Sequence, residues 1–285
     1  MGKRILGETM KLKAEQIQEN WDKLIQIVED TFEGERKELL LKMYSDFKDR
    51  GMFAPASSTD YFHNAWPGGY VCHILNIIDC SLKLYNIWKD SGAFTKDYGE
   101  EEVIFCAMHH DLGKLGDLTQ DYYQPNDSEW HRINQGKMYK ENQNLHYMTV
   151  TDRAVWILSQ YGIKMSQIEY LALRLTDGMY EDGNVGYLKA YAENHQLKTN
   201  LPLILHQADM MATRIEKESY MFGGSSNIPY EEILTPEVKE EKEQKEKELL
   251  ENVKEEFGAP TETETPTVSS SQTAKDLFNE LFGDK

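Results

Sequence analysis

The sequence predicts an all-α protein whose helices pack around a sizeable hydrophobic core. Several long stretches carry apolar residues at spacings of three and four, which is the period of a helix that buries one face. Few stretches alternate apolar and polar residues as a half-buried strand does. The chain has 285 residues, of which 40% are hydrophobic, so it is long enough for one large domain or two small ones.

We assign residues 1–50 to N-terminal helices that pack on the core. Within this stretch, one helix face carries Ile17, Trp21, Leu24 and Val28. The segment "ERKELLLKMYSDFKDR" repeats the same apolar spacing. A loop is expected next, because "GMFAPASSTDYFHNAWPGGY" is interrupted by Gly, Pro and Ser.

The central part of the chain, residues 51–220, contains its most apolar helices. The strongest candidates are "VCHILNIIDCSLKLYNIW" at 71–88 and "EEVIFCAMHHDLGKL" at 101–115. The polar residues between them and the next helix, 116–136, are expected to form a long loop. Three further helices are expected at 148–161, 166–175 and 201–218.

The composition changes after the last apolar helix. We expect a loop and a charged helix at 221–257, because "VKEEKEQKEKELLENVKEEF" is almost entirely charged or polar. Residues 258–274 contain "GAPTETETPTVSSSQT", a low-complexity composition that cannot supply a packed core. The sequence therefore predicts a disordered linker there.

The last segment, residues 275–285, returns to apolar residues, and we interpret it as a partner-binding peptide on a tether. In a helix, one stripe would be formed by Leu277, Phe278, Leu281 and Phe282. Such apolar and acidic C-termini resemble the peptides by which replication proteins of bacteria and phages bind a sliding clamp. Two alternatives stay open, a segment docked on its own domain and a frayed tail. A partner-binding role predicts that deleting the segment abolishes partner capture without changing the melting temperature.

The charge and the cysteines restrict the function classes. The net charge of −18 disfavours binding of nucleic acid through bulk charge, although a metal or a local positive site could hold a small anionic substrate. The 3 cysteines lie in apolar runs without a CxxC pair, which favours reduced thiols. No stretch approaches the roughly 18 apolar residues of a membrane span. We expect a cytoplasmic protein without membrane contact, in the host cytoplasm if phage-encoded.

The segment "AMHHDLGKLGD", residues 107–117, places imidazoles next to a carboxylate in an apolar helix. His110 and Asp111 together offer nitrogen and oxygen ligands, which suit a divalent Mn, Fe, Co, Ni or Zn ion better than an ion that prefers oxygen alone, such as Mg. A buried carboxylate is costly unless it is paired or bound to a metal. The alternative is that Gly113 ends the helix and Asp111 faces water.

Two distant residues share the same anomaly. His73 and Asp209 are each polar residues inside strongly apolar stretches, "GGYVCHILNII" and "LPLILHQADMMATRIE". Together with the pair at 110–111 they would form a four-ligand metal site with positions left for water. The identity of the metal, and whether one or two ions bind, stay open.

This set of residues resembles the HD superfamily of metal-dependent phosphohydrolases. The residues that carry the resemblance are, in chain order, His73, His110, Asp111, Gly113, Lys114 and Asp209. The segment "APASSTDYFHNAWPGGYVCHILNI" is similar to the one before the first metal histidine in YhaM-like 3′–5′ exoribonucleases and in related phage and bacterial HD proteins. The segments "MTVTDRAVWILSQYGIKMSQIEYLALRLTDGMYEDGN" and "LPLILHQADMMATRIE" are similar to later parts of that group.

The resemblance implies an all-helical HD phosphohydrolase domain at residues 51–220. It also implies a metal held by His73, His110, Asp111 and Asp209. The expected chemistry is hydrolysis of phosphate bonds by a metal-activated water, with Asp111 and Lys114 as catalytic residues. Lys114 would hold a phosphate as a point charge. The alternative for Lys114 is a solvated lysine at a helix end.

Further candidates for substrate or second-metal contacts are His63, His146, Asp177 and His206. Relatives of this group often have His-Asp-Gly where this chain has "TDG", and Thr176 at the histidine position puts a complete second metal site in doubt. His206 lies on the same helix face as Asp209, so it is expected either to support the site or simply to pack. His109 is expected to be structural.

The expected function is hydrolysis of phosphate ester or anhydride bonds of nucleotides. The first alternative is a 3′–5′ exonuclease or phosphodiesterase on single-stranded nucleic acid, which the resemblance supports and the charge opposes. The second is an HD scaffold that acts as an interaction protein through its tail. Base, sugar, phosphate number and oligomeric state cannot be derived from the sequence.

Overall fold

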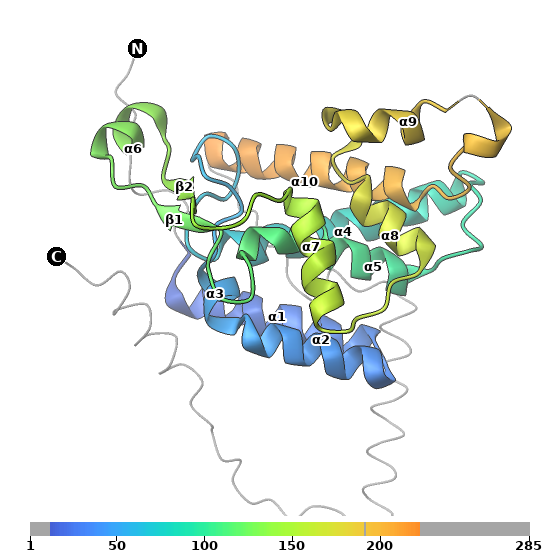
Figure 1. The fold of residues 1–285 in the computed structure, drawn as a ribbon, viewed down its shortest axis with the longest axis horizontal. Helices are drawn as coiled ribbons and strands as arrows, with labels where there is room; N and C mark the ends of the chain where they lie inside the picture. The colour runs from blue at the N-terminus through green and yellow to red at the C-terminus, as the bar shows by residue number, and fades with distance from the viewer. Residues whose placement is uncertain (1–11, 191, 223–285) are drawn as a thin grey trace, which may run out of the picture.

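The computed structural model describes residues 12–190 and 192–222, and they are mostly helical (Figure 1). The helices are α1 (Ala14–Thr31), α2 (Gly34–Asp46), α3 (Lys48–Phe53), α4 (Gly69–Asp90), α5 (Glu100–His109), α6 (Glu129–Gln135), α7 (Val150–Gln160), α8 (Gln167–Arg174), α9 (Val185–Leu188) and α10 (Leu201–Phe222). Apart from residues 221–222, the predicted charged helix, linker and terminal peptide lie outside the described residues. The stripe Leu277, Phe278, Leu281 and Phe282 lies outside them as well.

Helix α4 is the centre of the fold. Nearly all of its first 17 positions are buried, and it packs against α10 and α5. A helix that is apolar on every face must be covered on every face. Figure 1 shows α4, α5 and α10 stacked in the middle of the molecule. A polar side chain in the first 14 residues of α4, residues 69–82, therefore lies in the interior.

The N-terminal helices cover another side of this centre. Helix α1 contacts α2, α3 and α4, and the side chains of Ile17, Trp21, Leu24 and Val28 are all buried, as their spacing predicts. The ring of Trp21 packs edge-on against Tyr44 of α2, with 6.1 Å between ring centroids. Helices α1 and α2 form the lower layer in Figure 1.

The expected loop at 116–136 is wrong in part. It contains strand β1 (Tyr123–Pro125), and helix α6 begins at Glu129 after Ser128, whose hydroxyl accepts from the backbone N–H of His131. Strand β2 (Tyr139–Glu141) pairs antiparallel with β1, three residues on each side. Such short elements on a polar surface leave no apolar period to detect.

The expected helix at 101–115 is shorter than predicted. Helix α5 ends at His109, and a 3₁₀ turn, Leu112–Leu115, follows. The turn packs against α7, where a Cβ atom on Gly113 would lie 2.0 Å from the carbonyl oxygen of Val150. Glycine is required there by close approach of two backbones. The change of helix type places residues 110 and 111 at the end of α5.

No helix in the described part of the chain combines the length and the apolar character needed to cross a membrane.

Candidate metal centre

Three helices bring the candidate ligands together. His73 lies on α4, the pair His110 and Asp111 follows α5, and Asp209 lies on α10. The Nε2 atom of His73 is 3.5 Å from Oδ2 of Asp111 and 3.6 Å from Oδ1 of Asp209. The Nε2 atom of His110 is also 3.5 Å from Oδ2 of Asp111. We call these four residues the metal-site cluster.

The cluster is buried, apart from its carboxylate edge. His73 and His110 are each 1% exposed and Asp111 is 8% exposed, whereas 27% of the Asp209 side chain is exposed. The alternative in which Asp111 faces water is therefore wrong. The interior position makes every unpaired polar atom costly.

Two imidazole nitrogens in the cluster have no hydrogen-bond partner among the described residues, and both are buried: Nε2 of His73 and Nε2 of His110. The other ring nitrogens are occupied. Nδ1 of His110 lies 2.8 Å from the carbonyl oxygen of Ala107, and Nδ1 of His73 lies 3.0 Å from the carboxylate of Glu216. A carbonyl only accepts, so the proton of His110 is on Nδ1 and the lone pair is on Nε2.

This donor set fits a divalent ion. Ligand atoms of His73, His110 and Asp209 lie within 4.8 Å of one another, a spacing at which one ion can be shared. Metal-bound histidines typically donate their second N–H to a carbonyl or carboxylate, as both do here. The mixture of two imidazoles and two carboxylates suits Mn, Fe, Co, Ni or Zn.

The electrostatics keep His73 and Asp111 in the forms that bind metals. Burial lowers the pKa of His73 to about 4, outweighing the nearby carboxylates, so its imidazole is neutral near pH 7. Burial alone would raise the pKa of Asp111, but Lys114 and the two histidines hold it well below its usual range. A neutral imidazole and an ionised carboxylate are the forms that bind metals.

Lys114 is part of the site. Its Nζ atom lies 2.6 Å from Oδ2 of Asp111, and only 15% of its side chain is exposed. Burial alone would lower the pKa of Lys114, but Asp111 raises it above its usual value. The alternative of a solvated lysine is wrong, and the side chain places a fixed positive charge beside the cluster.

Sequence reasoning missed one residue, Glu216. It is 0% exposed, and its carboxylate contacts Nδ1 of His73 and accepts from Nδ2 of Asn76 at 2.6 Å. Burial raises the pKa of Glu216 to about 7 against the opposing influence of His63. The signal was present, because Glu216 lies seven residues after Asp209 and so shares its helix face.

His63 lies next to this inner carboxylate. Its ring centroid is 4.6 Å from that of His73, and His63, His73 and Glu216 form a second group whose ligand atoms lie within 4.8 Å. Burial lowers the pKa of His63 to about 3. His63, which lies in the loop before α4, therefore comes close to the metal-site cluster on the side of Glu216.

The remaining candidates lie farther out. His206 and Asp177 border, together with Asp209, a pocket of about 450 Å³. Nδ1 of His206 donates to the carbonyl oxygen of Thr176 at 2.7 Å, so its Nε2 carries the lone pair. His146 is exposed and belongs to neither histidine–carboxylate group found among residues 12–190 and 192–222.

His109 and His110 are neighbours with opposite surroundings. Nδ1 of His109 donates to the carbonyl oxygen of Phe105 at 2.7 Å, and its Nε2 lies 3.2 Å from the hydroxyl of Tyr44. Both nitrogens are thus hydrogen-bonded inside the core. His109 has the contacts of a structural residue.

Comparison with known proteins adds no relative to these observations. No family model, no curated protein and no solved structure matches the chain. The interpretation of the site therefore rests on its geometry and chemistry. What these establish is a mostly helical protein with buried groups of His, Asp and Glu side chains that could hold a metal ion.

Proposed function

We propose that this protein is an HD-type, metal-dependent phosphohydrolase that acts on nucleotides. One observation carries the proposal: two buried imidazole nitrogens, on His73 and His110, face the carboxylates of Asp111 and Asp209 without a hydrogen-bond partner among the described residues. Leaving two such atoms unsatisfied costs about 1–3 kcal/mol each unless a ligand completes them.

The residues would divide the chemistry among them. His73, His110, Asp111 and Asp209 would hold a divalent ion, which lowers the pKa of a water molecule and offsets charge on phosphoryl oxygens. Lys114, held against Asp111, would bind a non-bridging phosphate oxygen as a fixed cation. His206, with its free lone pair directed by Thr176, borders the pocket at Asp209 and would contact the substrate.

The test is a substrate screen on protein purified without chelator. Elemental analysis should find a divalent transition metal, and added Mn²⁺ should support release of phosphate from one or more mononucleotides. Chelator should remove both metal and activity. A chain that neither carries nor binds a divalent ion would refute the proposal.

The screen also separates the alternatives. We expect mononucleotides to be hydrolysed faster than oligonucleotides, because the net charge of −18 opposes a cationic track for a backbone. Rapid shortening of single-stranded RNA with little action on mononucleotides would favour the exonuclease. Metal binding without any hydrolysis, combined with tail-dependent capture of a partner, would favour the scaffold.

A further inference from the structure

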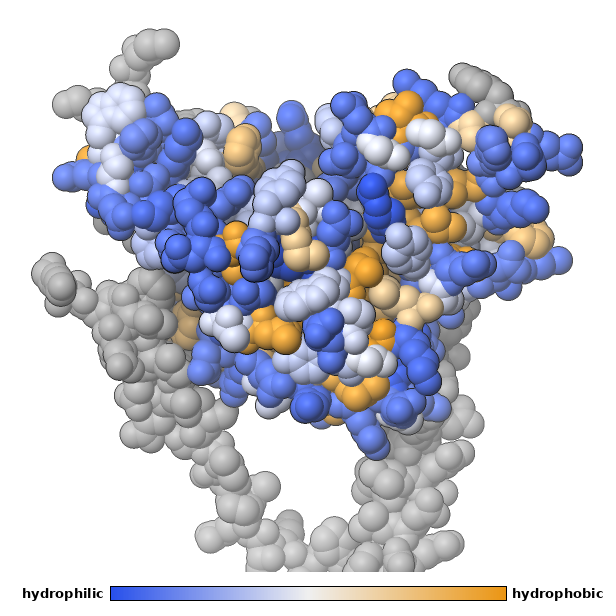
Figure 2. All heavy atoms as spheres, in the orientation of Figure 1, coloured by the Kyte–Doolittle hydropathy of each residue, from blue (hydrophilic) through white to orange (hydrophobic). Residues whose placement is uncertain are grey.

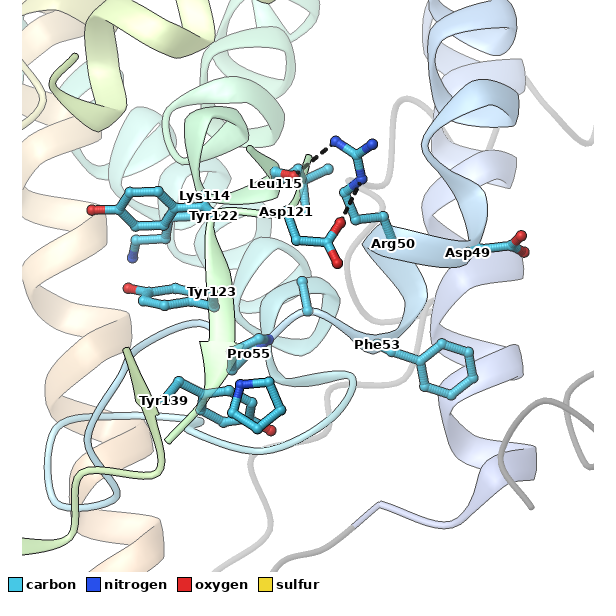
Figure 3. A pocket seen from close by; sticks show the side chains of 12 residues that line it. Asp49, Arg50, Phe53, Pro55, Lys114, Leu115, Asp121, Tyr122, Tyr123 and Tyr139 are labelled. Carbon is cyan, nitrogen blue, oxygen red and sulfur yellow. Dashed lines mark hydrogen bonds and ion pairs between the residues drawn. The ribbon is translucent and has the colours of Figure 1, made fainter. Parts of the chain in front are cut away.

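A second pocket opens beside Lys114, and Asp209 is not among the residues that line it. It measures about 190 Å³, and α3, the turn after α5 and the strands β1 and β2 all contribute to it. Its lining includes Phe53, Lys114, Tyr122, Tyr123, Pro125 and Tyr139. We call it the tyrosine pocket, and Figure 3 shows it from close by.

The walls of the tyrosine pocket are aromatic. The rings of Tyr122 and Tyr123 are 4.8 Å apart and edge-on, and Tyr123 is 6.2 Å from Tyr139 on the paired strand. Strand pairing fixes this arrangement, because Tyr139 is opposite Pro125 in the register of β1 and β2. Paired strands therefore hold the rings in place.

The charged groups of the pocket have different roles. Arg50 is occupied: its Nε atom lies 2.8 Å from Asp121, and its guanidinium also donates to the carbonyl oxygen of Leu115. Arg50 stabilises the wall of the pocket, and few of its N–H groups remain for a ligand. Lys114 both lines the pocket and contacts Asp111 of the metal-site cluster. In Figure 3 the amine of Lys114 and the hydroxyl of Tyr123 extend in the same direction.

We propose that the tyrosine pocket binds the base of a nucleotide whose phosphate contacts both Lys114 and the metal-site cluster. The inference rests on the proposed function and adds the substrate's recognition site. Its volume is below the roughly 300–1,000 Å³ that encloses a whole drug-sized ligand, so it suits one ring system with the sugar and phosphate outside. Aromatic walls stack on planar bases of any identity.

Binding of nucleosides tests the proposal without requiring hydrolysis. Adenosine, guanosine, cytidine and uridine carry a base and no phosphate, so each can be titrated into the full-length protein by calorimetry. At least one should bind, and Tyr139→Leu and Tyr123→Leu should each raise its Kd about tenfold or more. The matched control is Tyr147→Leu, because Tyr147 is 95% exposed and does not line the pocket.

Each outcome is decisive for the base site. Absence of nucleoside binding to the wild type, or a Kd that Tyr139→Leu leaves unchanged, overturns it. Should the leucine variants fail to fold, photolabelling of the wild type with 8-azidoadenosine replaces them. Label in the peptides that contain residues 122–125 or 139–141 supports the site, and label confined to other peptides overturns it.

The same experiment keeps the two proposals apart. Inorganic phosphate serves as a probe of the metal side, and Tyr139→Leu should leave its binding unchanged. A protein that binds a nucleoside in the tyrosine pocket but hydrolyses no phosphate bond would refute the phosphohydrolase and retain the base site. Conversely, nucleotide hydrolysis with a KM that the pocket variants leave unchanged would refute the base site and retain the phosphohydrolase.

Discussion

Two polar clusters meet the end of α5, and they differ in whether their histidine nitrogens are hydrogen-bonded. The metal-site cluster leaves Nε2 of His73 and of His110 without hydrogen-bond partners in the described part of the chain. The other, which we call the His109 cluster, contains Arg36, Tyr44, Glu169 and His109, and both nitrogens of its histidine are hydrogen-bonded.

Protein groups pair both nitrogens of His109 and most of the other polar atoms of the His109 cluster, although Nε of Arg36 has no hydrogen-bond partner among the described residues. The guanidinium of Arg36 forms ion pairs with Glu169 and, at 3.0 Å, with Glu101, and it lies 4.0 Å above the ring of Phe105. Glu169 also accepts from the backbone N–H of Ser166 at 2.7 Å. His109 is 0% exposed and His110 is 1% exposed, but only His109 has both ring nitrogens hydrogen-bonded. A buried histidine whose nitrogens are both bonded stabilises the fold, and one with a free lone pair is available to a ligand.

The largest expected effect comes from removing a free lone pair. His110→Ala should weaken binding of Mn²⁺ by more than about 100-fold, since loss of groups that only orient a ligand already costs 10–100-fold. Phosphate release should fall in parallel. Calorimetric titration of chelator-treated protein measures the affinity.

The neighbouring histidine is the matched control for that experiment. His109→Ala should lower the melting temperature while leaving the Mn²⁺ affinity within about threefold of the wild type. Equal loss of metal affinity in both variants would contradict the separation of the two clusters.

The metal-site cluster also shows how much of the site the sequence can predict. His73 and Asp209 were detectable because a polar residue in an apolar helix is conspicuous, and the structure brings both next to His110 and Asp111. Their convergence depends on three helices docking correctly, which the helical period alone does not specify. That they bind a metal stays a prediction.

Glu216 and the tyrosine pocket are harder to recognise in the sequence. Glu216 shares a helix face with Asp209, but acidic residues are common near the end of a helix. Only the packing of α10 on α4 shows that Glu216 is buried. The tyrosine pocket depends on β1 and β2, which are three residues long. Strands this short are fixed by tertiary contacts, so no local pattern predicts them.

The next largest effect should arise in the His109 cluster. Glu169→Ala leaves the guanidinium of Arg36 without its buried partner, so the free energy of unfolding should fall by about 3 kcal/mol. Affinity for Mn²⁺ should be unchanged. Urea denaturation of full-length protein measures the loss, and a decrease below about 1 kcal/mol would show that Glu101 alone can satisfy Arg36.

A smaller effect is expected from the residue that orients His73. Glu216→Gln preserves the shape of the side chain but removes the carboxylate that accepts from Nδ1, so Mn²⁺ affinity should fall about 10- to 100-fold. Asp79→Asn, on the same helix as His73, is the control, because the Asp79 carboxylate pairs with the exposed Lys83. Equal affinities of the Gln variant and the wild type would assign Glu216 a purely structural role.

The smallest expected effect sharpens the assignment of His109. Tyr44→Phe removes the hydroxyl near Nε2 of His109 and keeps the ring, so unfolding should become easier by about 1–2 kcal/mol. Metal content and phosphate release should not change. A Tyr44→Phe variant that loses metal would indicate that the two clusters are coupled through α5.

The position of Glu216 on α10 has a consequence for the order of folding. It lies 143 residues beyond the histidine that it orients, so the site joins segments that are remote along the chain. Closing such long loops is slow and happens only as the whole topology forms. Loading of the ion should therefore follow folding, unlike in small metal motifs whose nearby ligands nucleate the fold. Mn²⁺ present during refolding should leave the folding rate unchanged and slow only the unfolding of the finished protein.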